Sequence, residues 1–368
     1  MSYIYTDMKG SARVMHEDYN NTVAGWVNES IVIALPELLE CINKLYEQNP
    51  ERFESTETSF SIADFGCATG ASSITPLRTV IDRIKQINSE KEIHVYLEDL
   101  PENRFDLAFT TVQEGLKDYK NVFIMAAGKD FSQQVFPNKF LDISFSSLTA
   151  MILPSPPAPL DDNVFFLANP ENTETERGKK WIEGFNQHWV QFMNSRKAEL
   201  KKDGLLFVTL IINQNPNKDY QTKENEFYHE VATQVLKKVL TKYNVEDKIS
   251  SCMKTTVSVY KSHYLDICNS IPDLHVVSSN DFDVKDIFYH EYIETNDLKT
   301  FGQKVASYIQ GWWGDVLEGG LAQQGVDQQI IKEVSKEVFE ILPEFVESRL
   351  NIYPEYYNVL ALAVQRTA

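Results

Sequence analysis

Residues 61–73 read SIADFGCATGASS, and this stretch decides how the chain is interpreted. A short apolar run is followed by an acid, a turn with glycines at 66 and 70, and small polar residues. This order is typical of a buried strand whose end leads through a tight turn into a helix. Because glycine lets the backbone approach a ligand closely, the turn predicts a ligand cradle or, failing that, a plain strand-to-helix connection.

Two phosphate-binding interpretations of the turn fit poorly. A P-loop needs GxxxxGK[ST], whereas Gly66 and Gly70 are too close together and no Lys follows. A dinucleotide site needs GxGxxG, but here the spacing is GxxxG, with Ala68 between and no third glycine. The pattern Asp-x-Gly-x-small-x-Gly, beginning at Asp64, fits a site for S-adenosylmethionine better, because the acid can lie beneath the methionine part.

Polar residues at the ends of the next two expected strands support that site. The segment YLEDLP ends the second strand with Asp99, next to Glu98, and a carboxylate there can bind both ribose hydroxyls. After the third strand, GKDF supplies Asp130 for the adenine amino group and Phe131 for the face of its ring. Each signal alone is common, but three in order on consecutive strands favour a nucleoside cofactor.

The rest of the chain alternates between strand and helix patterns, which predicts βαβ units and a mostly parallel sheet. The last expected strand should pair at the edge of that sheet. The helix expected from Trp181 carries Trp181, Phe185, Trp189 and Phe192 on one stripe, which favours core packing, and it should end at Gly204. The expected strands are 60–65, 92–100, 121–128, 140–147, 205–213, 273–282 and 356–366.

Composition narrows the class of protein. The 368 residues carry a net charge of −18, which argues against nucleic acid and anionic membranes as partners. The four cysteines lie far apart with no CxxC or Cys/His cluster, so we expect no metal site. The sequence has no secretory leader pattern and no window of 18 apolar residues, so a cytoplasmic protein is expected.

Several blocks of the chain resemble the SABATH methyltransferases, named for salicylate, benzoate and theobromine enzymes. IADFGCATGASS is similar to the family's IADLGCSSGANT, and VYLEDLPENRFDLAF to FFLNDLPxNDFNxxF. GKDFSQQVFPNKFLDISFSSLTAMIL resembles GSFYxRLFPxxSLHFxHSSYSLMWL, and FMNSRKAELKKDGLLFVTL resembles FLxxRxxELVxGGRMVLTF. The opening MKG…DYNNT looks like MNGG…SYAxNS, so the resemblance covers most of the chain.

The resemblance implies an α/β fold: a Rossmann-like class I methyltransferase sheet with a mostly helical cap. It implies S-adenosylmethionine as methyl donor, S-adenosylhomocysteine as product, a small-molecule acceptor of secondary metabolism and a homodimer. We expect four parts: an N-terminal helical segment closing over the cofactor (1–58), a cofactor-binding core (59–222), a helical cap with the acceptor pocket and a late core strand (223–325), and a final helix with an antiparallel edge strand (326–368).

Matching the motifs position by position assigns the cofactor contacts. Asp130 stands where members usually have Ser, but an acid can also accept from the adenine amino group. Cys67 is expected to pack beneath the cofactor and not to act as a nucleophile, since no His or Arg is near in sequence. Together with the glycine turn, Asp64 and Ser146, the carried-over contacts are Tyr19, Cys67, Ser72, Asp99, Leu100, Asp130 and Phe131.

The acceptor half of the family's site is not reproduced. Members that methylate carboxylates have a Tyr and a Trp in SSYSLMW, where this chain has Leu148 and Ile152 in SSLTAMI. They also have a Gln near the amino terminus, where this chain has Gly25 or Trp26. Leu148 and Ile152 could therefore form the floor of an apolar acceptor pocket or pack in the core.

Three other groups of side chains have two readings each. Trp312 and Trp313, between glycines, could line an aromatic acceptor pocket or anchor the core or a dimer interface. Ser146 at the end of the fourth strand is expected to touch the cofactor, whereas its neighbours Ser144 and Ser147 are expected to cap the next turn. The lone histidines of the cap region are expected to be surface or core residues, not bases: His263, His275 and His290.

The sequence therefore favours a methyltransferase that converts a small carboxylic acid to its methyl ester. A carboxylate is ionised at pH 7 and needs no catalytic base, so none is expected. Because the carboxylate-binding pair is missing, methylation of a ring nitrogen or hydroxyl of a small heterocycle or aromatic stays open as an alternative. A non-catalytic binding protein on the same fold is a further alternative.

Overall fold

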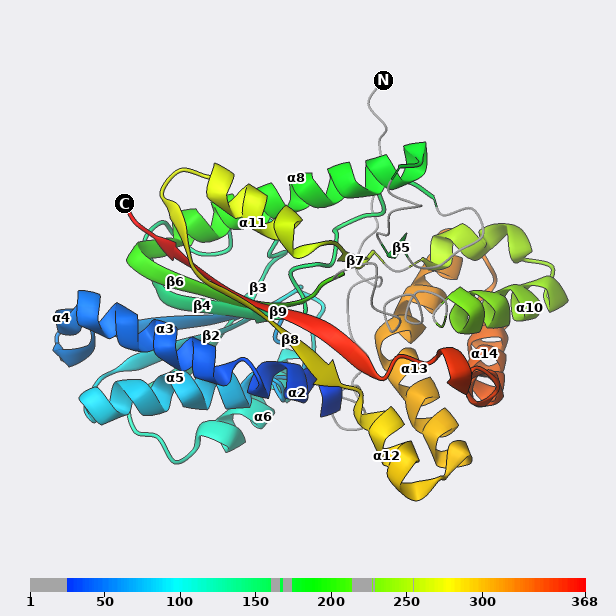
Figure 1. Ribbon diagram of the computed structural model, residues 1–368, viewed down its shortest axis with the longest axis horizontal. Helices are drawn as coiled ribbons and strands as arrows, with labels where there is room; N and C mark the ends of the chain where they lie inside the picture. The colour runs from blue at the N-terminus through cyan, green and yellow to red at the C-terminus, as the bar shows by residue number, and fades with distance from the viewer. Residues whose placement is uncertain (1–24, 160–165, 168–173, 214–226, 228, 254) are drawn as a thin grey trace.

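The computed structural model describes residues 25–159, 166–167, 174–213, 227, 229–253 and 255–368, with the side chains of 25–27, 166–167 and 229 excepted. Within these residues a twisted sheet flanked by helices forms one half of the molecule, and a group of helices forms the other half (Figure 1). Tyr19 lies outside the described residues. Trp26 lies on a described helix, but its side chain is not described.

Seven strands form the sheet in the order β3-β2-β1-β4-β6-β9-β8. Strands β3, β2, β1, β4 and β6 are parallel, and β9 is antiparallel to both of its neighbours. The mostly parallel sheet expected from the sequence is confirmed. The strands are β1 (Phe60–Phe65), β2 (Ile93–Asp99), β3 (Val122–Gly128), β4 (Leu141–Ser147), β6 (Leu200–Ile211), β8 (Leu274–Lys285) and β9 (Tyr356–Arg366).

The prediction that the last strand lies at the edge of the sheet is wrong. Strand β9 pairs with β6 on one side and with β8 on the other, so β8 is the edge strand. The reason lies in the sequences of the two strands. Residues 357–365 of β9 are all buried and include the apolar run 359–364, whereas β8 mixes polar and apolar residues that are mostly exposed or half-exposed.

Helices cover both faces of the sheet (Figure 1). One face packs against α3 (Leu35–Gln48), α5 (Ile74–Ile87) and α6 (Phe105–Leu116). The other face packs against α8 (Glu176–Glu199) and α11 (Lys261–Ser270). Shorter elements complete this half: α2 (Gly25–Val32), α4 (Pro50–Glu54), and a two-stranded sheet of β5 (Phe166–Leu167) and β7 (Val257–Ser258).

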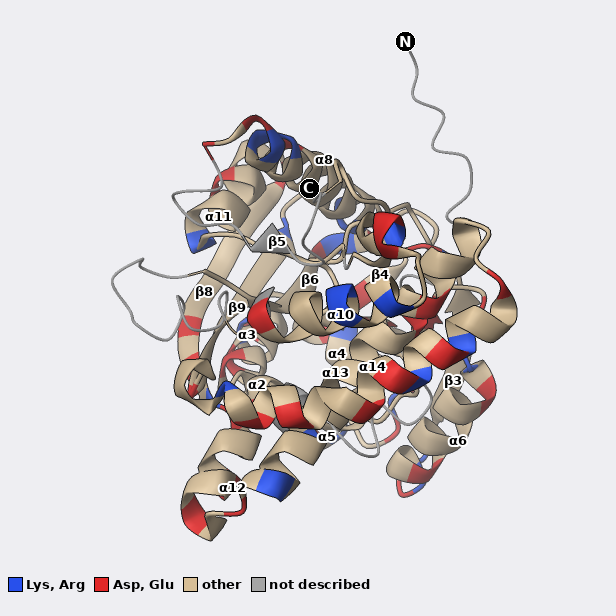
Figure 2. Ribbon diagram, turned by 90° about the vertical axis from the view of Figure 1, so that its right-hand side faces the viewer, with Lys and Arg blue, Asp and Glu red and all other residues tan. Residues whose placement is uncertain are grey.

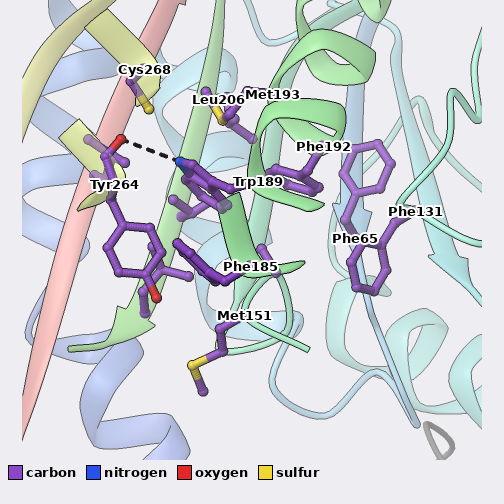
Figure 3. Packing of buried hydrophobic residues seen from close by; sticks show 14 of the residues in the cluster. Phe65, Phe131, Met151, Phe185, Trp189, Phe192, Met193, Leu206, Tyr264 and Cys268 are labelled. Atoms are coloured by element: carbon purple, nitrogen blue, oxygen red, sulfur yellow. Dashed lines mark hydrogen bonds between the residues drawn. The ribbon is translucent and has the colours of Figure 1, made fainter. Parts of the chain in front are cut away.

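Helix α8 carries the aromatic stripe expected from its sequence. Trp181, Phe185, Trp189 and Phe192 are all buried, and Figure 3 shows three of them facing Tyr264 and Phe131. The core-packing interpretation is confirmed. The helix ends earlier than predicted, at Glu199, and Gly204 lies within β6. The left-handed residue at the reversal is Asp203, with φ of 59°.

The helical cap lies beyond the carboxyl ends of the strands (Figure 1). The apolar side chains of α14 pack against α13 and α10, so α14 belongs to the cap and not to the sheet, contrary to the expected division at residue 326. Figure 2 shows acidic and basic segments interspersed on the cap helices. The cap consists of η1 (His229–Thr233), α10 (Gln234–Lys242), η2 (Glu246–Cys252), α12 (Ile287–Thr295), α13 (Leu298–Gln323), α14 (Gln328–Ser348) and η3 (Leu350–Ile352).

Candidate functional site

The glycine turn between β1 and α5 is tight and closely packed. Gly66 and Gly70 have φ of 80° and 82°, in the left-handed region that favours glycine. A Cβ added at Gly66 would lie 2.4 Å from Cγ2 of Thr149, and one at Gly70 would lie 2.7 Å from Cγ2 of Val112. Both glycines are therefore required, for backbone conformation and for space.

Ala68, the middle residue of the turn, also takes a left-handed conformation, with φ of 47°. The end of β2 and the loop that follows it hold it there. Its backbone N–H donates to Oδ2 of Asp99 over 2.7 Å, and its carbonyl accepts from Nδ2 of Asn103 over 2.8 Å. Neighbouring strand ends thus fix the turn, and its middle position carries an alanine in a conformation that is strained for any residue with a Cβ.

Asp99 is the best-oriented acid of the site. Besides the bond from Ala68, its Oδ1 accepts from the backbone N–H of Leu100 over 2.8 Å, so both oxygens have fixed directions. The side chain is half-buried at the end of β2, beside the turn. Each oxygen of an ionised carboxylate can accept more than one hydrogen bond, so a carboxylate in this place can also bind two vicinal hydroxyls.

Asp64 lies deeper, beneath the turn. It is 3% exposed, and its Oδ2 accepts from the hydroxyl of Ser73 at the start of α5. Burial raises the pKa of its carboxyl to about 7, against the lowering effect of the Ser73 hydrogen bond. Asp64 therefore orders the helix start from below, and its charge responds to conditions near neutral pH.

Glu98 is a further buried carboxyl that the sequence reasoning noted only as a neighbour of Asp99. Its Oε2 accepts from the backbone N–H of Gly66 over 3.2 Å. Burial, and then the charge of Asp99, raise its pKa well above the usual range, while Arg196 opposes them. With Asp64 and Asp99 it makes the floor of the turn rich in acids.

Cys67 is fully buried in this floor. Burial raises the pKa of its thiol well above the ordinary value, and the acids Asp99, Asp64 and Glu98 raise it further. A thiol in such surroundings stays protonated and unreactive. Asn103 also lies within 3.8 Å of its Sγ; the residue stands in the DLPENRF block, which was the available sequence signal for its role.

The segment after β3 carries Asp130 and Phe131. Oδ1 of Asp130 accepts from the backbone N–H of Ser132 over 2.8 Å. Phe131 is 5% exposed, and its ring packs edge-on against Phe192 and His188, with centroids 6.0 and 6.2 Å away. Most of the Phe131 ring thus belongs to the α8 core (Figure 3).

Residues at and after the end of β4 take three different places. The hydroxyl of Ser146 donates to the carbonyl of Phe65 over 2.9 Å, inside the sheet. Leu148 is left-handed, with φ of 56°, half-buried, and packed against both the cap core and the α8 core. Ile152 is buried and forms a β-bridge with Thr256. Ser72 and Leu100 lie half-buried in the turns after β1 and β2.

The two tryptophans of α13 differ in position. Trp313 is fully buried in the cap core and donates to the carbonyl of Cys252 over 2.9 Å. A side chain with no accessible surface does not line a pocket, so the structure corrects that reading and gives Trp313 the core role. Trp312 is half-buried beside Tyr308, with ring centroids 6.1 Å apart.

Taken together, the strand ends bring Asp64, Glu98, Asp99 and the backbone of the turn to one place, below the sheet–cap junction at Leu148. A close-approach backbone beside the oriented carboxylate of Asp99 suits a hydroxyl-bearing ligand. Within the described residues, no group of His, Cys, Asp and Glu is arranged to hold a metal ion. In the same residues no helix is both long and apolar enough to cross a membrane.

The chain is similar in sequence to known methyltransferases over about half of its length. The chain is 27% identical over 177 residues to gibberellic acid methyltransferase 2 of Arabidopsis thaliana, covering 42% of this chain and 44% of that protein. It is 22% identical over 223 residues to 3,7-dimethylxanthine N-methyltransferase 2 of Coffea arabica, 55% of each chain. The matched region is thus about half the length of these curated relatives.

The fold is shared with a solved structure over almost its whole length. A loganic acid methyltransferase solved with S-adenosylhomocysteine superposes with a TM-score of 0.77 at 15% identity, covering 97% of this chain and 99% of that one. The family model for S-adenosylmethionine-dependent carboxyl methyltransferases matches residues 27–363. The chain therefore belongs to the SABATH family of S-adenosylmethionine-dependent methyltransferases.

Proposed function

We propose that this protein transfers a methyl group from S-adenosylmethionine to the carboxylate of a small organic acid. The observation that carries the proposal is the arrangement around Asp99, whose oxygens are oriented by the N–H groups of Ala68 and Leu100 at the glycine turn. The ribose hydroxyls would donate to Asp99, and the backbone of Gly66–Gly70 would lie against the methionine part. When bound, the cofactor supplies a methyl group activated by a sulfonium.

The chain's own residues then have two tasks, alignment and exclusion of water. Holding donor and acceptor in line can lower a barrier by roughly 7–11 kcal/mol. Leu148 and Ile211, at the carboxyl ends of β4 and β6, pack against both the cap and the α8 core, so the junction above the turn is apolar. An apolar junction removes water from an acceptor carboxylate, and the less hydrated oxygen is a stronger nucleophile.

Several points support a carboxylate as the acceptor. A carboxylate is ionised at neutral pH and needs no base. His263 lies on α11, which packs on the sheet, and its ring stacks on Tyr260. Burial lowers its pKa, which disfavours the protonated form. The family model is itself named for carboxyl methylation. The N-methyltransferase among the relatives keeps methylation of a ring nitrogen as the second candidate.

Labelled product separates these candidates. The protein is incubated with methyl-labelled S-adenosylmethionine and a panel of small carboxylic acids and nitrogen heterocycles. We expect label in an organic-soluble product that alkali releases, since methyl esters hydrolyse and N-methyl groups do not. Alkali-stable product would favour the heterocycle. Calorimetric titration that shows no binding of S-adenosylmethionine or S-adenosylhomocysteine would contradict both.

A further inference from the structure

A buried ion pair lies in the last turn of helix α8, in contact with the segment that follows β3. Arg196 and Glu199 are 1% and 0% exposed, and two parallel bonds join them: Nε to Oε2 over 2.7 Å and Nη2 to Oε1 over 2.9 Å. Burying two charges carries a large desolvation penalty, which further hydrogen bonds must offset.

The further hydrogen bonds hold the backbone of residues 131–136. Arg196 donates to the carbonyl of Phe131 over 2.9 Å and to that of Gln133 over 3.0 Å. Oε1 of Glu199 accepts from the N–H groups of Val135 and Phe136. One ion pair thus fixes two carbonyls and two N–H groups of a six-residue loop, and this loop starts immediately after Asp130.

The same pair reaches the strand that leads into the glycine turn. The guanidinium carbon of Arg196 lies 3.8 Å from the centroid of the Phe65 ring, on the last residue of β1. The same guanidinium carbon lies 5.0 Å from the centroid of the Phe192 ring, which packs edge-on against Phe131; Figure 3 labels these rings. Arg196 therefore connects the loop after β3 with the end of β1, which leads into the turn.

We propose that the Arg196–Glu199 pair positions the adenine-binding loop, and so sets both the affinity for the cofactor and the preference for adenine, without touching the cofactor. The inference rests on the proposed function. Buried pairs of this kind contribute little net stability compared with apolar residues of similar volume. An apolar pair lacks the fixed, planar geometry of an Arg–Glu pair. Here that geometry fixes the loop after Asp130, and so the direction in which Asp130 presents its carboxylate to the base.

The test uses two ligands that differ only at the base. S-adenosylhomocysteine presents an amino group to Asp130, whereas S-inosylhomocysteine presents a carbonyl oxygen. Both are titrated calorimetrically into the wild type and into Arg196→Lys, which keeps the charge but loses the planar fork. We expect Arg196→Lys to weaken S-adenosylhomocysteine by about tenfold or more, and S-inosylhomocysteine by much less.

A matched control lies at the other end of the sheet. Asp142 is buried and ion-paired with Arg52 and Lys201, so Asp142→Asn disturbs a similar group far from the loop. It should lower the thermal unfolding temperature and leave the preference for adenine unchanged. If Arg196→Lys does not fold, the double variant Arg196→Met/Glu199→Met is used instead, because it leaves no unpaired buried charge.

The outcomes are distinct. Loss of the adenine preference in a folded Arg196 variant, with Asp142→Asn unchanged, supports the proposal. Unchanged affinity, or an equal loss for both ligands, overturns it, because a merely structural role would weaken both alike. If the wild type binds neither ligand, the proposed function itself fails.

Discussion

Buried carboxylates lie at both ends of the parallel strands, but their surroundings differ. At the amino ends, Asp142 accepts from Lys201 and from the N–H of Ser61 over 2.8 Å each, with Arg52 at 3.3 Å. At the carboxyl ends, Asp64 and Glu98 accept from a hydroxyl and a backbone N–H instead. The first end is neutralised by cations of the chain. At the second end burial raises the pKa values of Asp64 and Glu98, and Asp99, half-buried beside them, is the acid most accessible to a ligand.

The largest expected effect is on the affinity of the acidic end for the cofactor. Asp99→Ala removes the carboxylate proposed to hold two hydroxyls, and hydrogen bonds to charged groups are the strong ones, so affinity for S-adenosylhomocysteine should fall about 100-fold or more. Calorimetry measures it. Asp99→Asn, which keeps one acceptor oxygen, should lose less. Wild-type affinity in folded Asp99→Ala would show that the acidic end does not bind the cofactor.

The next effect separates close packing from backbone conformation at the turn. Gly66→Ala meets both a positive φ and Thr149, and should lower the free energy of unfolding by about 2–4 kcal/mol. Gly325→Ala is the matched control, because its φ is 74° but no atom lies within 4 Å of the added Cβ. It should cost only about 1 kcal/mol. Equal losses in urea unfolding would contradict the packed turn.

A pH dependence should distinguish the acidic end. Asp64 has a folded-state pKa of about 7 against an ordinary value of 3.8, so between these values the folded chain keeps a proton that the unfolded chain releases. Its stabilising contribution is complete below about pH 4 and is lost as pH rises through about 7. The difference in unfolding free energy between Asp64→Asn and the wild type should therefore shift in favour of the variant across this window. A pH-independent difference would refute it.

The smallest expected effect is on stability and comes from the left-handed residue in the middle of the turn. Ala68→Gly removes a Cβ from a left-handed residue and should raise the free energy of unfolding by about 0.5 kcal/mol, since the relief of strain exceeds the added entropy of the unfolded chain. Urea unfolding checks this. A loss of stability instead would mean that the methyl group makes contacts that outweigh the strain.

The sequence predicted those parts of the site that follow from short motifs at strand ends, namely Asp64, the two glycines and Asp99. It did not predict contacts between distant segments. Asn103 and Arg196 stand in the blocks that resemble the family, but only the fold shows that they hold Ala68 and the loop after β3. For the same reason Trp313 resembled a pocket residue until its burial in the cap was known.

The order of strands was predictable only in part. Hydrophobic runs identified the strands, but pairing depends on partners far along the chain, and β9 joins β6 to β8 where an edge strand was expected. A continuous apolar run shows that a strand is buried on both faces of the sheet, but it does not show which strands are its neighbours.

The place of β9 also has an evolutionary consequence. Strands β8 and β9 form an antiparallel hairpin whose connection is most of the cap, and the hairpin is closed at its mouth by a bond from the N–H of Asp286 to the carbonyl of Glu355 over 3.0 Å. Segment 287–352 can therefore diverge, or be grafted from a relative, while the register of the hairpin is retained. The pairing of β9 with β6, and so the sheet that carries the glycine turn, is then independent of the sequence of segment 287–352.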